Sequence, residues 1–322
     1  MTDAEYLAME KSTIVRSEKR LPLLSLIRAG SRALSAVAPA LAAGLAERLF
    51  LTPPRPRWSA AELALLASGR ARPLQVGKRH VDVWLWGSGP SVLLVHGWGG
   101  RGTQLASFVE PLVARGFSVV TFDAPGHGPT DSGLVTIPEM VDATRAVAAS
   151  RGPLAGMIAH SVGATVAARA LYEGLDAGAT VFVSPAADLA GPATRFTATL
   201  GFSPAVGAAM RRRIEARVGR PFSAFDVAAL APALSLPLLV IHDRGDGVVP
   251  WQHGRVIAHA WRGAGLLMTD GLGHHRILRD PDVVAAAVAF LAARTEERRL
   301  APLATTDDAA LSDPLGALRE GI

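Results

Sequence analysis

The sequence predicts an α/β fold, with a mainly parallel sheet of about eight strands, helices on both faces and a small helical cap. From residue 80 onward, short apolar runs alternate with helical patterns, which is typical of βαβ units. The runs are apolar throughout, as in Pro237–Ile241, so both faces of these strands are expected to be buried. The chain has 322 residues, of which 49% are hydrophobic, and this is enough for a large core.

Residues 1–75 are expected to form an N-terminal helical extension. Residues 1–20 are polar and charged and are predicted to be frayed, whereas residues 21–50 are rich in Ala and Leu and have a helical pattern. A proline-rich connector follows at 52–57, and a capping-box signature at Ser59–Glu62 predicts a short helix to about Ser68. We expect the helices of 21–50 to pack on the main domain.

The main domain is expected to span residues 76–187 and 235–294. Its predicted strands are Val81–Trp86, Ser91–Val95, Phe117–Phe122, Leu154–Ala159, Thr180–Val183, Pro237–Ile241 and Gly265–Thr269. Helical patterns at Gln104–Arg115, Pro138–Ser150, Val162–Glu173 and Pro281–Arg294 separate several of them.

Two segments interrupt or follow this alternation. Residues 188–234 show no clear strand and carry glycine and proline punctuation, so they are predicted to be a helical lid inserted over the sheet. Residues 295–322 turn polar and aperiodic and are predicted to be a disordered tail.

The net charge of +5 belongs to the N-terminal extension. Residues 1–75 hold eleven Lys/Arg and six Asp/Glu, whereas the rest of the chain holds twenty-two of each. No basic stripe is interleaved with aromatic residues, which argues against a nucleic-acid partner. The absence of cysteine excludes disulfides and thiol nucleophiles and fits a cytoplasmic protein.

The apolar stretch at 33–46 is too short to span a membrane and contains Pro39. Helices packed on the main domain are one interpretation of it. The alternative is weak peripheral membrane contact, with Arg28 and Arg32 beside the apolar surface.

Polar residues gather where the predicted strands end. Six of the nine histidines follow a strand, and ligands of open parallel sheets bind beyond the carboxyl ends of the strands. These histidines are His96, His127, His160, His242, His274 and His275. The sequence therefore predicts a site at this edge of the sheet.

Ser161 lies between a predicted strand and a predicted helix, as the nucleophile elbow requires. The turn is tight, and the small residues Ala159 and Gly163 stand two positions before and after the serine. A serine hydroxyl needs a general base, and the base needs a carboxylate. The chain supplies candidates in the order Ser161, Asp246, His274.

These separated motifs resemble the α/β-hydrolase superfamily over roughly residues 80–292. The resemblance implies that Ser161 is the nucleophile, Asp246 the acid of a D-x-x-V-P loop, and His274 the base. It also implies an oxyanion hole formed by the backbone N–H groups of Trp98 and Val162. Asp243 or Asp188 as the acid, and His275 as the base, remain alternatives.

The loops around the elbow have supporting residues and departures from the usual pattern. His96, Gly97, His160 and Gly163 are expected to shape these loops, while Ala159 replaces the more usual glycine. The run Gly97–Gly100 lacks the Lys and Ser/Thr of a P-loop, and no metal or cofactor site is expected.

The resemblance implies a cofactor-free serine hydrolase of a carboxylic ester, with a small-molecule ester or thioester as its partner. A thioesterase, a C–C bond hydrolase and a non-catalytic ligand-binding protein are the alternatives. Ser161 argues against epoxide or haloalkane chemistry, which needs a carboxylate at this position. Five lid arginines are either a solvated helix face or a site for an anionic substrate: Arg211, Arg212, Arg213, Arg217 and Arg220.

Overall fold

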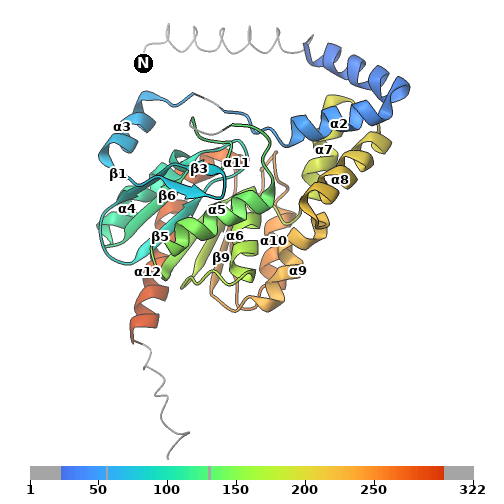
Figure 1. The fold of residues 1–322 in the computed structure, drawn as a ribbon. Coiled ribbons are helices and arrows are strands. Elements are labelled where there is room, and N and C mark those ends of the chain that lie inside the picture. Colours follow the sequence, from blue (N-terminus) through green and yellow to red (C-terminus); the bar gives the residue numbers. More distant parts are fainter. Residues whose placement is uncertain (1–22, 56, 130–131, 301–322) are drawn as a thin grey trace, which may run out of the picture.

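The computed structural model describes residues 23–55, 57–129 and 132–300. A central sheet lies between layers of helices, and a helical cap stands at one side of it (Figure 1). The frayed start predicted for 1–20 and the part of the predicted tail beyond Leu300 lie outside the described residues.

The main sheet has eight strands in the order β1-β4-β6-β5-β7-β8-β9-β10. The pairs β1/β4 and β4/β6 are antiparallel, and all the other neighbours are parallel. The strands are β1 (Arg70–Ala71), β4 (Val83–Trp86), β5 (Ser91–Val95), β6 (Ser118–Phe122), β7 (Leu154–His160), β8 (Thr180–Val183), β9 (Leu238–Asp243) and β10 (Gly265–Thr269). The predicted fold class, with its mainly parallel sheet, is confirmed.

The sheet begins earlier than the predicted start of the main domain. Strand β1 lies inside the segment expected to be a helical extension, and it pairs with β4. A separate hairpin of β2 (Leu74–Val76) and β3 (Arg79–Val81) follows, so the single strand predicted at 81–86 is divided. Strands of two or three residues without an apolar run carry too little pattern to be found from sequence.

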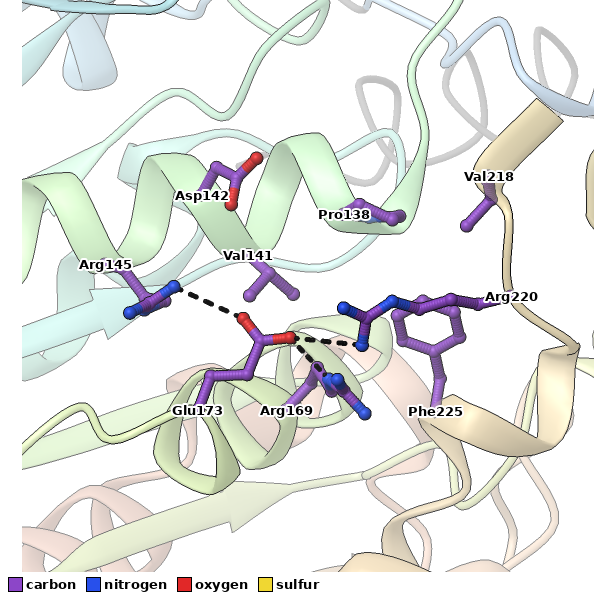
Figure 2. Close-up of a pocket in the computed structure, with 9 residues that line it drawn as sticks. All are labelled: Pro138, Val141, Asp142, Arg145, Arg169, Glu173, Val218, Arg220 and Phe225. Carbon is purple, nitrogen blue, oxygen red and sulfur yellow. Dashed lines mark hydrogen bonds and ion pairs between the residues drawn. The ribbon is translucent and has the colours of Figure 1, made fainter.

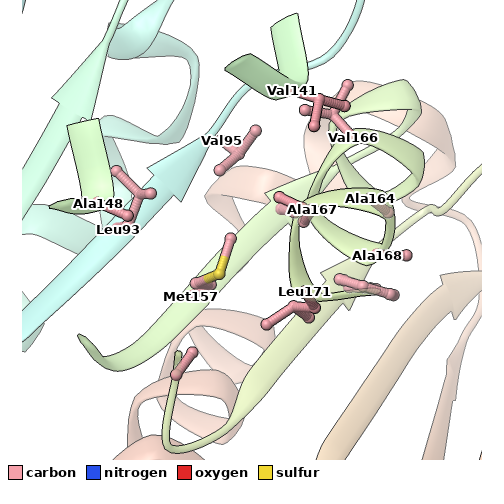
Figure 3. Close-up of a cluster of buried hydrophobic side chains, with 14 of the residues drawn as sticks. Leu93, Val95, Val141, Ala148, Met157, Ala164, Val166, Ala167, Ala168 and Leu171 are labelled. Carbon is pink, nitrogen blue, oxygen red and sulfur yellow. The ribbon is translucent and has the colours of Figure 1, made fainter. Parts of the chain in front are cut away.

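Helices cover both faces of the sheet, and each face has its own apolar core. In β5, Leu93 and Val95 point into one core, whereas Val92 and Leu94 point into the other. This alternation with both faces buried explains the continuous apolar runs of the sequence. The first core, shown in Figure 3, packs Met157 against the valines and alanines of two helices.

The first face is covered by α5 (Ile137–Ala149), α6 (Val162–Tyr172), α9 (Val227–Leu230) and α10 (Gln252–Ala260). The second is covered by α3 (Ala60–Ser68), the 3₁₀ helix Gly102–Phe108, α4 (Val109–Ala114), the 3₁₀ helix Ile277–Arg279 and α12 (Pro281–Leu300). The short helix α11 (Gly273–Arg276) follows β10.

The cap lies between β8 and β9, within the range predicted for the lid. It contains α7 (Ala190–Leu200), α8 (Pro204–Val218) and the 3₁₀ helix Phe222–Phe225. The 3₁₀ helix Ala231–Ala233 follows α9 and packs with it in the first core, so the end of the predicted lid belongs to the main domain. A third apolar core joins the cap to α2 (Pro39–Phe50), which packs along α8 (Figure 1). The N-terminal helices therefore pack mainly on the cap, where we expected them to pack on the main domain.

The C-terminal helix extends further than the sequence indicated. Helix α12 continues to Leu300, so the disorder predicted from residue 295 is wrong for residues 295–300. Two ion pairs at i,i+3 spacing, Arg294–Glu297 and Glu296–Arg299, support this polar last stretch as a solvated helix. Among the described residues, no helix is both long and apolar enough to cross a membrane.

Candidate active site

Ser161 occupies a strained turn between β7 and α6. Its φ of 55° and ψ of −125° place it in a region that residues other than glycine rarely adopt. A side chain at Gly163 would come within 2.5 Å of the backbone oxygen of His96, so the turn accepts no larger residue there. Ala159 is fully buried, and its methyl group fits where glycine is more usual. The turn thus lifts the serine hydroxyl away from the sheet.

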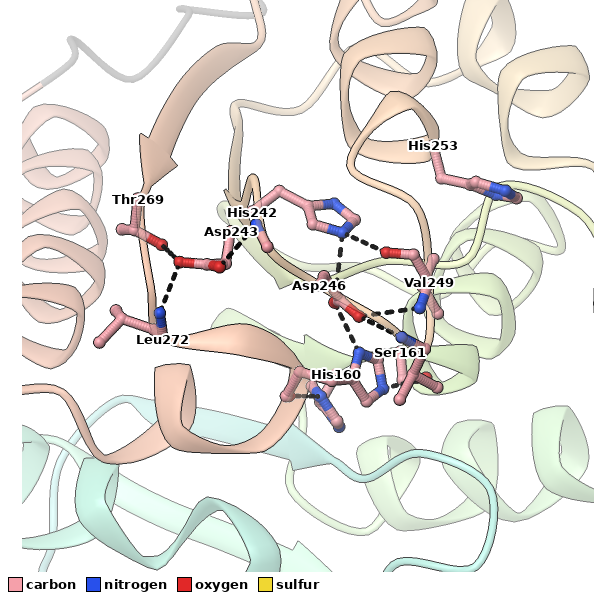
Figure 4. A network of polar contacts seen from close by, with 12 residues as sticks. His160, Ser161, His242, Asp243, Asp246, Val249, His253, Thr269 and Leu272 are labelled. Carbon is pink, nitrogen blue, oxygen red and sulfur yellow. Dashed lines mark hydrogen bonds and ion pairs between the residues drawn. The ribbon is translucent and has the colours of Figure 1, made fainter.

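The structure brings Ser161, His274 and Asp246 into one hydrogen-bonded chain (Figure 4). His274 Nε2 lies 3.1 Å from Ser161 Oγ, and His274 Nδ1 lies 2.7 Å from Asp246 Oδ2. All three side chains are buried, and they come from loops that follow β7, β9 and β10. The parallel strands bring residues far apart in sequence to one edge of the sheet.

Asp246 is held as a carboxylate by several donors. Its Oδ1 accepts the N–H groups of Val248 and Val249, each at 2.8 Å. Burial alone would raise the pKa of Asp246, but hydrogen bonds from His242, His274 and the Val249 N–H hold the pKa well below its usual range. The carboxylate is therefore charged wherever the protein is folded at moderate pH.

His242 is a contact of Asp246 that the sequence reasoning did not assign. Its Nε2 lies 3.0 Å from the Val249 carbonyl oxygen and 3.4 Å from Asp246 Oδ2. The ring is fully buried beneath the loop that carries the aspartate. The position of His242 directly after the predicted strand Pro237–Ile241 indicated that it could lie near the site. The sequence does not show, however, that its ring points toward Asp246.

The alternative residues have other partners. Asp243 accepts hydrogen bonds from Gly245, Thr269 and Leu272, which fixes the loops after β9 and β10. Asp188 accepts the N–H of Gly191 and lies 3.8 Å from His253. His275 lines the pocket beside His274, with 5.0 Å between the ring centroids.

The two residues of the predicted oxyanion hole both border the cavity next to Ser161. Trp98 and Val162 both line the pocket with Ser161, and neither N–H has a hydrogen-bond acceptor among the described residues. Val162 begins α6, where the first N–H groups have no intrahelical acceptor. The two groups are thus available to a ligand oxygen.

Buried histidines stabilise the loops around the serine. His96 Nδ1–H donates to the Gly97 carbonyl oxygen at 2.8 Å, and its Nε2 accepts the Ala124 N–H at 2.9 Å. Burial lowers the pKa of His96 to about 3, so the ring stays neutral and keeps both hydrogen bonds. Gly97 lets this loop approach closely, because a Cβ there would lie 3.0 Å from Ser161 Cβ.

His160 contacts both the backbone and the ring of His274. Its Nε2–H donates to the His274 carbonyl oxygen at 3.0 Å, and the two ring centroids are 4.6 Å apart. Burial, with the nearby His274, lowers the pKa of His160 well below its usual range. A neutral His160 therefore fixes the backbone of His274 without adding a charge beside it.

The serine opens into an apolar cavity of about 630 Å³. The cavity is lined from the cap by apolar side chains that include Phe196, Leu200 and Phe222. Phe50 and Leu51, at the end of α2, complete its wall. Sequence reasoning missed this contribution because no motif links the N-terminal helix to the pocket.

A second cavity of about 620 Å³ adjoins the first and is polar (Figure 2). Glu173 forms ion pairs there with Arg145, Arg169 and Arg220, at 3.4, 2.7 and 3.6 Å. Arg145 comes from α5 and Arg169 from α6, whereas Arg220 follows α8. The cluster therefore ties the cap to the helices of the main domain.

The lid arginines are used mainly in ion pairs. Arg213 and Arg217 contact Glu47, and Arg211 contacts Glu215. Of the five, all of which the structure describes, Arg220 alone lines the apolar cavity. Within the described ranges, no group of three or more His, Asp or Glu side chains is arranged to hold a metal ion.

Comparisons with known proteins bear on the family and the fold of this chain. Residues 92–287 match the sequence profile described as the Alpha/beta hydrolase family. A search of curated proteins gave no match.

Solved structures share the fold at low sequence identity. An esterase from Thermogutta terrifontis is 19% identical, with a TM-score of 0.54, covering 70% of this chain and 99% of that one. A thioesterase domain from the curacin biosynthetic pathway is 16% identical, with a TM-score of 0.53 and coverage of 70% and 99%. A monoacylglycerol lipase from Paleococcus ferrophilus is 21% identical, with a TM-score of 0.53 and coverage of 66% and 99%.

Proposed function

Because this chain belongs to the alpha/beta hydrolase family, we propose that it is a serine hydrolase that cleaves a carboxylic ester through an acyl-enzyme. The observation that carries the proposal is the hydrogen-bonded chain Ser161–His274–Asp246 at the floor of an apolar cavity. A serine hydroxyl becomes a useful nucleophile when a neutral imidazole accepts its proton, and the contact of 3.1 Å places the two groups for that transfer.

In the first half of the reaction, Ser161 Oγ attacks the ester carbonyl carbon, and its proton passes to His274 Nε2. The carbonyl oxygen becomes an oxyanion that accepts the N–H groups of Trp98 and Val162. Asp246 stabilises the imidazolium and holds Nδ1 as the protonated nitrogen. The intermediate collapses when the alcohol leaves with the proton from His274.

In the second half, a water molecule attacks the acyl group on Ser161. His274 accepts the water proton and then returns it to Ser161 Oγ as the carboxylic acid departs. The apolar side chains of the cavity would receive the acyl chain, since burying an apolar chain against Phe196, Leu200 and Phe222 is favourable. The preferred substrate is therefore an ester of an apolar acid.

A thioester reacts through the same steps, and the geometry favours neither substrate over the other. Purified protein should be assayed on matched ester and thioester series of increasing acyl length. Ser161→Ala should lower kcat by about 10⁴-fold or more on every substrate that the wild type cleaves. Ser150→Ala, a surface serine outside both cavities, is the matched control and should retain full activity.

The same substrate series also tests the alternative that the protein is a non-catalytic ligand-binding protein. If Ser161→Ala and wild-type protein hydrolyse all substrates equally slowly while both bind apolar acids, the cavity is a ligand-binding site and the proposed chemistry is wrong.

A further inference from the structure

The N-terminal helices carry a row of exposed apolar side chains. On α2, Leu41, Leu45 and Leu49 are 70%, 42% and 44% exposed, and their spacing of four places them on one helix face. Val37, the last residue of the preceding helix, is 86% exposed. Of the thirteen exposed large hydrophobic residues in the described chain, seven lie between residues 23 and 49.

The leucines of this row are not part of the apolar core that holds α2 on the cap. The helix buries its other side, with Ala42, Ala43 and Ala46 against the cap, in the third core. The preceding helix, described over 23–37, likewise exposes Leu23, Leu26 and Ile27. Concentrated exposed apolar surface of this kind is typical of an interaction site.

The exposed charged residues of these two helices are all basic. Between residues 23 and 50 the basic residues are Arg28, Arg32 and Arg48, all exposed. The single acidic residue of this stretch, Glu47, is buried and ion-paired with Arg213 and Arg217. The exposed side of the two helices is therefore apolar and basic.

We propose that this docking face, defined by residues 23–49, binds the surface of a membrane that contains anionic lipids. Leucine side chains would enter the acyl boundary, while the arginines would contact lipid phosphates. A second copy of the chain fits less well, because a symmetric contact would bring the arginines of both copies together.

The position of the docking face would suit a hydrolase whose ester substrate lies in the membrane. The leucines of α2 are exposed, and the helix ends at Phe50, which lines the same cavity as Ser161. A docked protein would therefore hold one wall of that cavity beside the lipid. This consequence rests on the proposed function, whereas the docking itself does not.

Binding should be measured by co-sedimentation of the full chain with vesicles of phosphatidylcholine alone or mixed with phosphatidylglycerol. The wild type should bind the mixed vesicles more strongly than phosphatidylcholine alone. The triple substitution Leu41→Gln, Leu45→Gln and Leu49→Gln should weaken binding by at least about tenfold, because three apolar side chains no longer enter the lipid. Arg32→Gln with Arg48→Gln should remove most of the preference for phosphatidylglycerol.

The matched control is a variant with three apolar-to-glutamine substitutions elsewhere on the surface. Leu63→Gln, Val256→Gln and Leu266→Gln replace three comparably exposed side chains and should leave binding unchanged. Thermal melting and hydrolysis of a short soluble ester would show that each variant is folded. The Ser161→Ala protein should bind vesicles like the wild type, so failure of the catalytic proposal and failure of docking give different results.

Two outcomes would overturn the docking proposal. One is a wild type that stays in solution with both kinds of vesicle. The other is a wild-type dimer in sedimentation equilibrium that the leucine substitutions convert to a monomer, which would assign the face to a second copy.

Discussion

Asp246 is the residue on which the charge balance of the site depends. In the proposed mechanism His274 takes a proton from Ser161, and the new imidazolium would lie 2.7 Å from a carboxylate that four contacts hold in its charged form. An amide in its place could hydrogen-bond to His274 but could not stabilise its charge, and it could favour the wrong tautomer.

Asp246→Asn should therefore lower kcat by about 10⁴-fold with a small change in KM. Steady-state kinetics on the best ester would measure this. Asp270→Asn, an exposed aspartate that pairs with Arg244, is the control and should behave as the wild type. An Asp246→Asn enzyme with near-normal kcat would reassign the acid, with Asp188 and Asp243 as the remaining candidates.

Asp123 is expected to make the stability of the protein depend on pH. Its Oδ1 accepts the Gly102 N–H at 2.7 Å, but its Oδ2 is buried without a hydrogen-bond partner. Burial raises the pKa of Asp123 to about 6. The unfolded chain loses this proton near about pH 4, so between about pH 4 and 6 the folded state holds more protons, and the stability contribution of Asp123 falls as pH rises.

Asp123→Asn removes this titration. The free energy of unfolding of the variant, relative to the wild type, should rise by about 2–3 kcal/mol between about pH 4 and pH 7. Urea denaturation at several pH values would measure it, and the buried histidines, common to both proteins, cancel in the difference. A difference that stays constant over this range would contradict the raised pKa.

At the scale of elements, the buried ion pairs of Glu47 connect the N-terminal extension to the cap. Its carboxylate lies 2.6 Å from Arg213 Nε and 2.8 Å from Arg217 Nε, and the residue is 3% exposed. Burial opposes the charge, yet the two arginines hold the pKa of Glu47 below its usual value. These ion pairs fix α2 to α8 close to Phe50, which lines the cavity.

Glu47→Gln should lower the free energy of unfolding by about 1–2 kcal/mol, since the half-exposed arginines can turn to water once the carboxylate is gone. Hydrogen exchange of the 39–50 amides should also become faster. Glu297→Gln breaks an exposed pair on α12 and should cost less than about 0.5 kcal/mol. Equal effects of the two substitutions would mean that Glu47 does not fix α2.

Elements with a strong apolar pattern could be predicted from the sequence, and the weak ones could not. The strands β5 to β9 were located within two residues, because two buried faces require an uninterrupted apolar run. The edge strand β10 is only partly buried, but its apolar run was sufficient to locate it. The two-residue β1 pairs with β4, and the hairpin β2–β3 has strands of only three residues, so neither contains an apolar run that marks it as a strand. The helical end of α12 was missed for the same reason, since its support comes from charged pairs.

At the scale of the molecule, the sheet explains why the site residues could be chosen from sequence. Parallel strands bring their carboxyl ends to one edge, so the residues after β7, β9 and β10 had to meet there, and Ser161, Asp246 and His274 do. The cavity above them could not be predicted. Its wall combines α2 with the cap, and the contact of these two elements depends on small alanines and on one buried glutamate.

The proposed function requires that Ser161 is an activated nucleophile in an accessible cavity. The most direct test is to treat wild-type and Ser161→Ala protein with a fluorophosphonate and to locate the adduct by mass spectrometry. We expect one adduct, on Ser161, that is absent from the folded Ser161→Ala protein. An unlabelled wild type that a smaller sulfonyl fluoride also fails to modify, or an adduct on another residue, would contradict it.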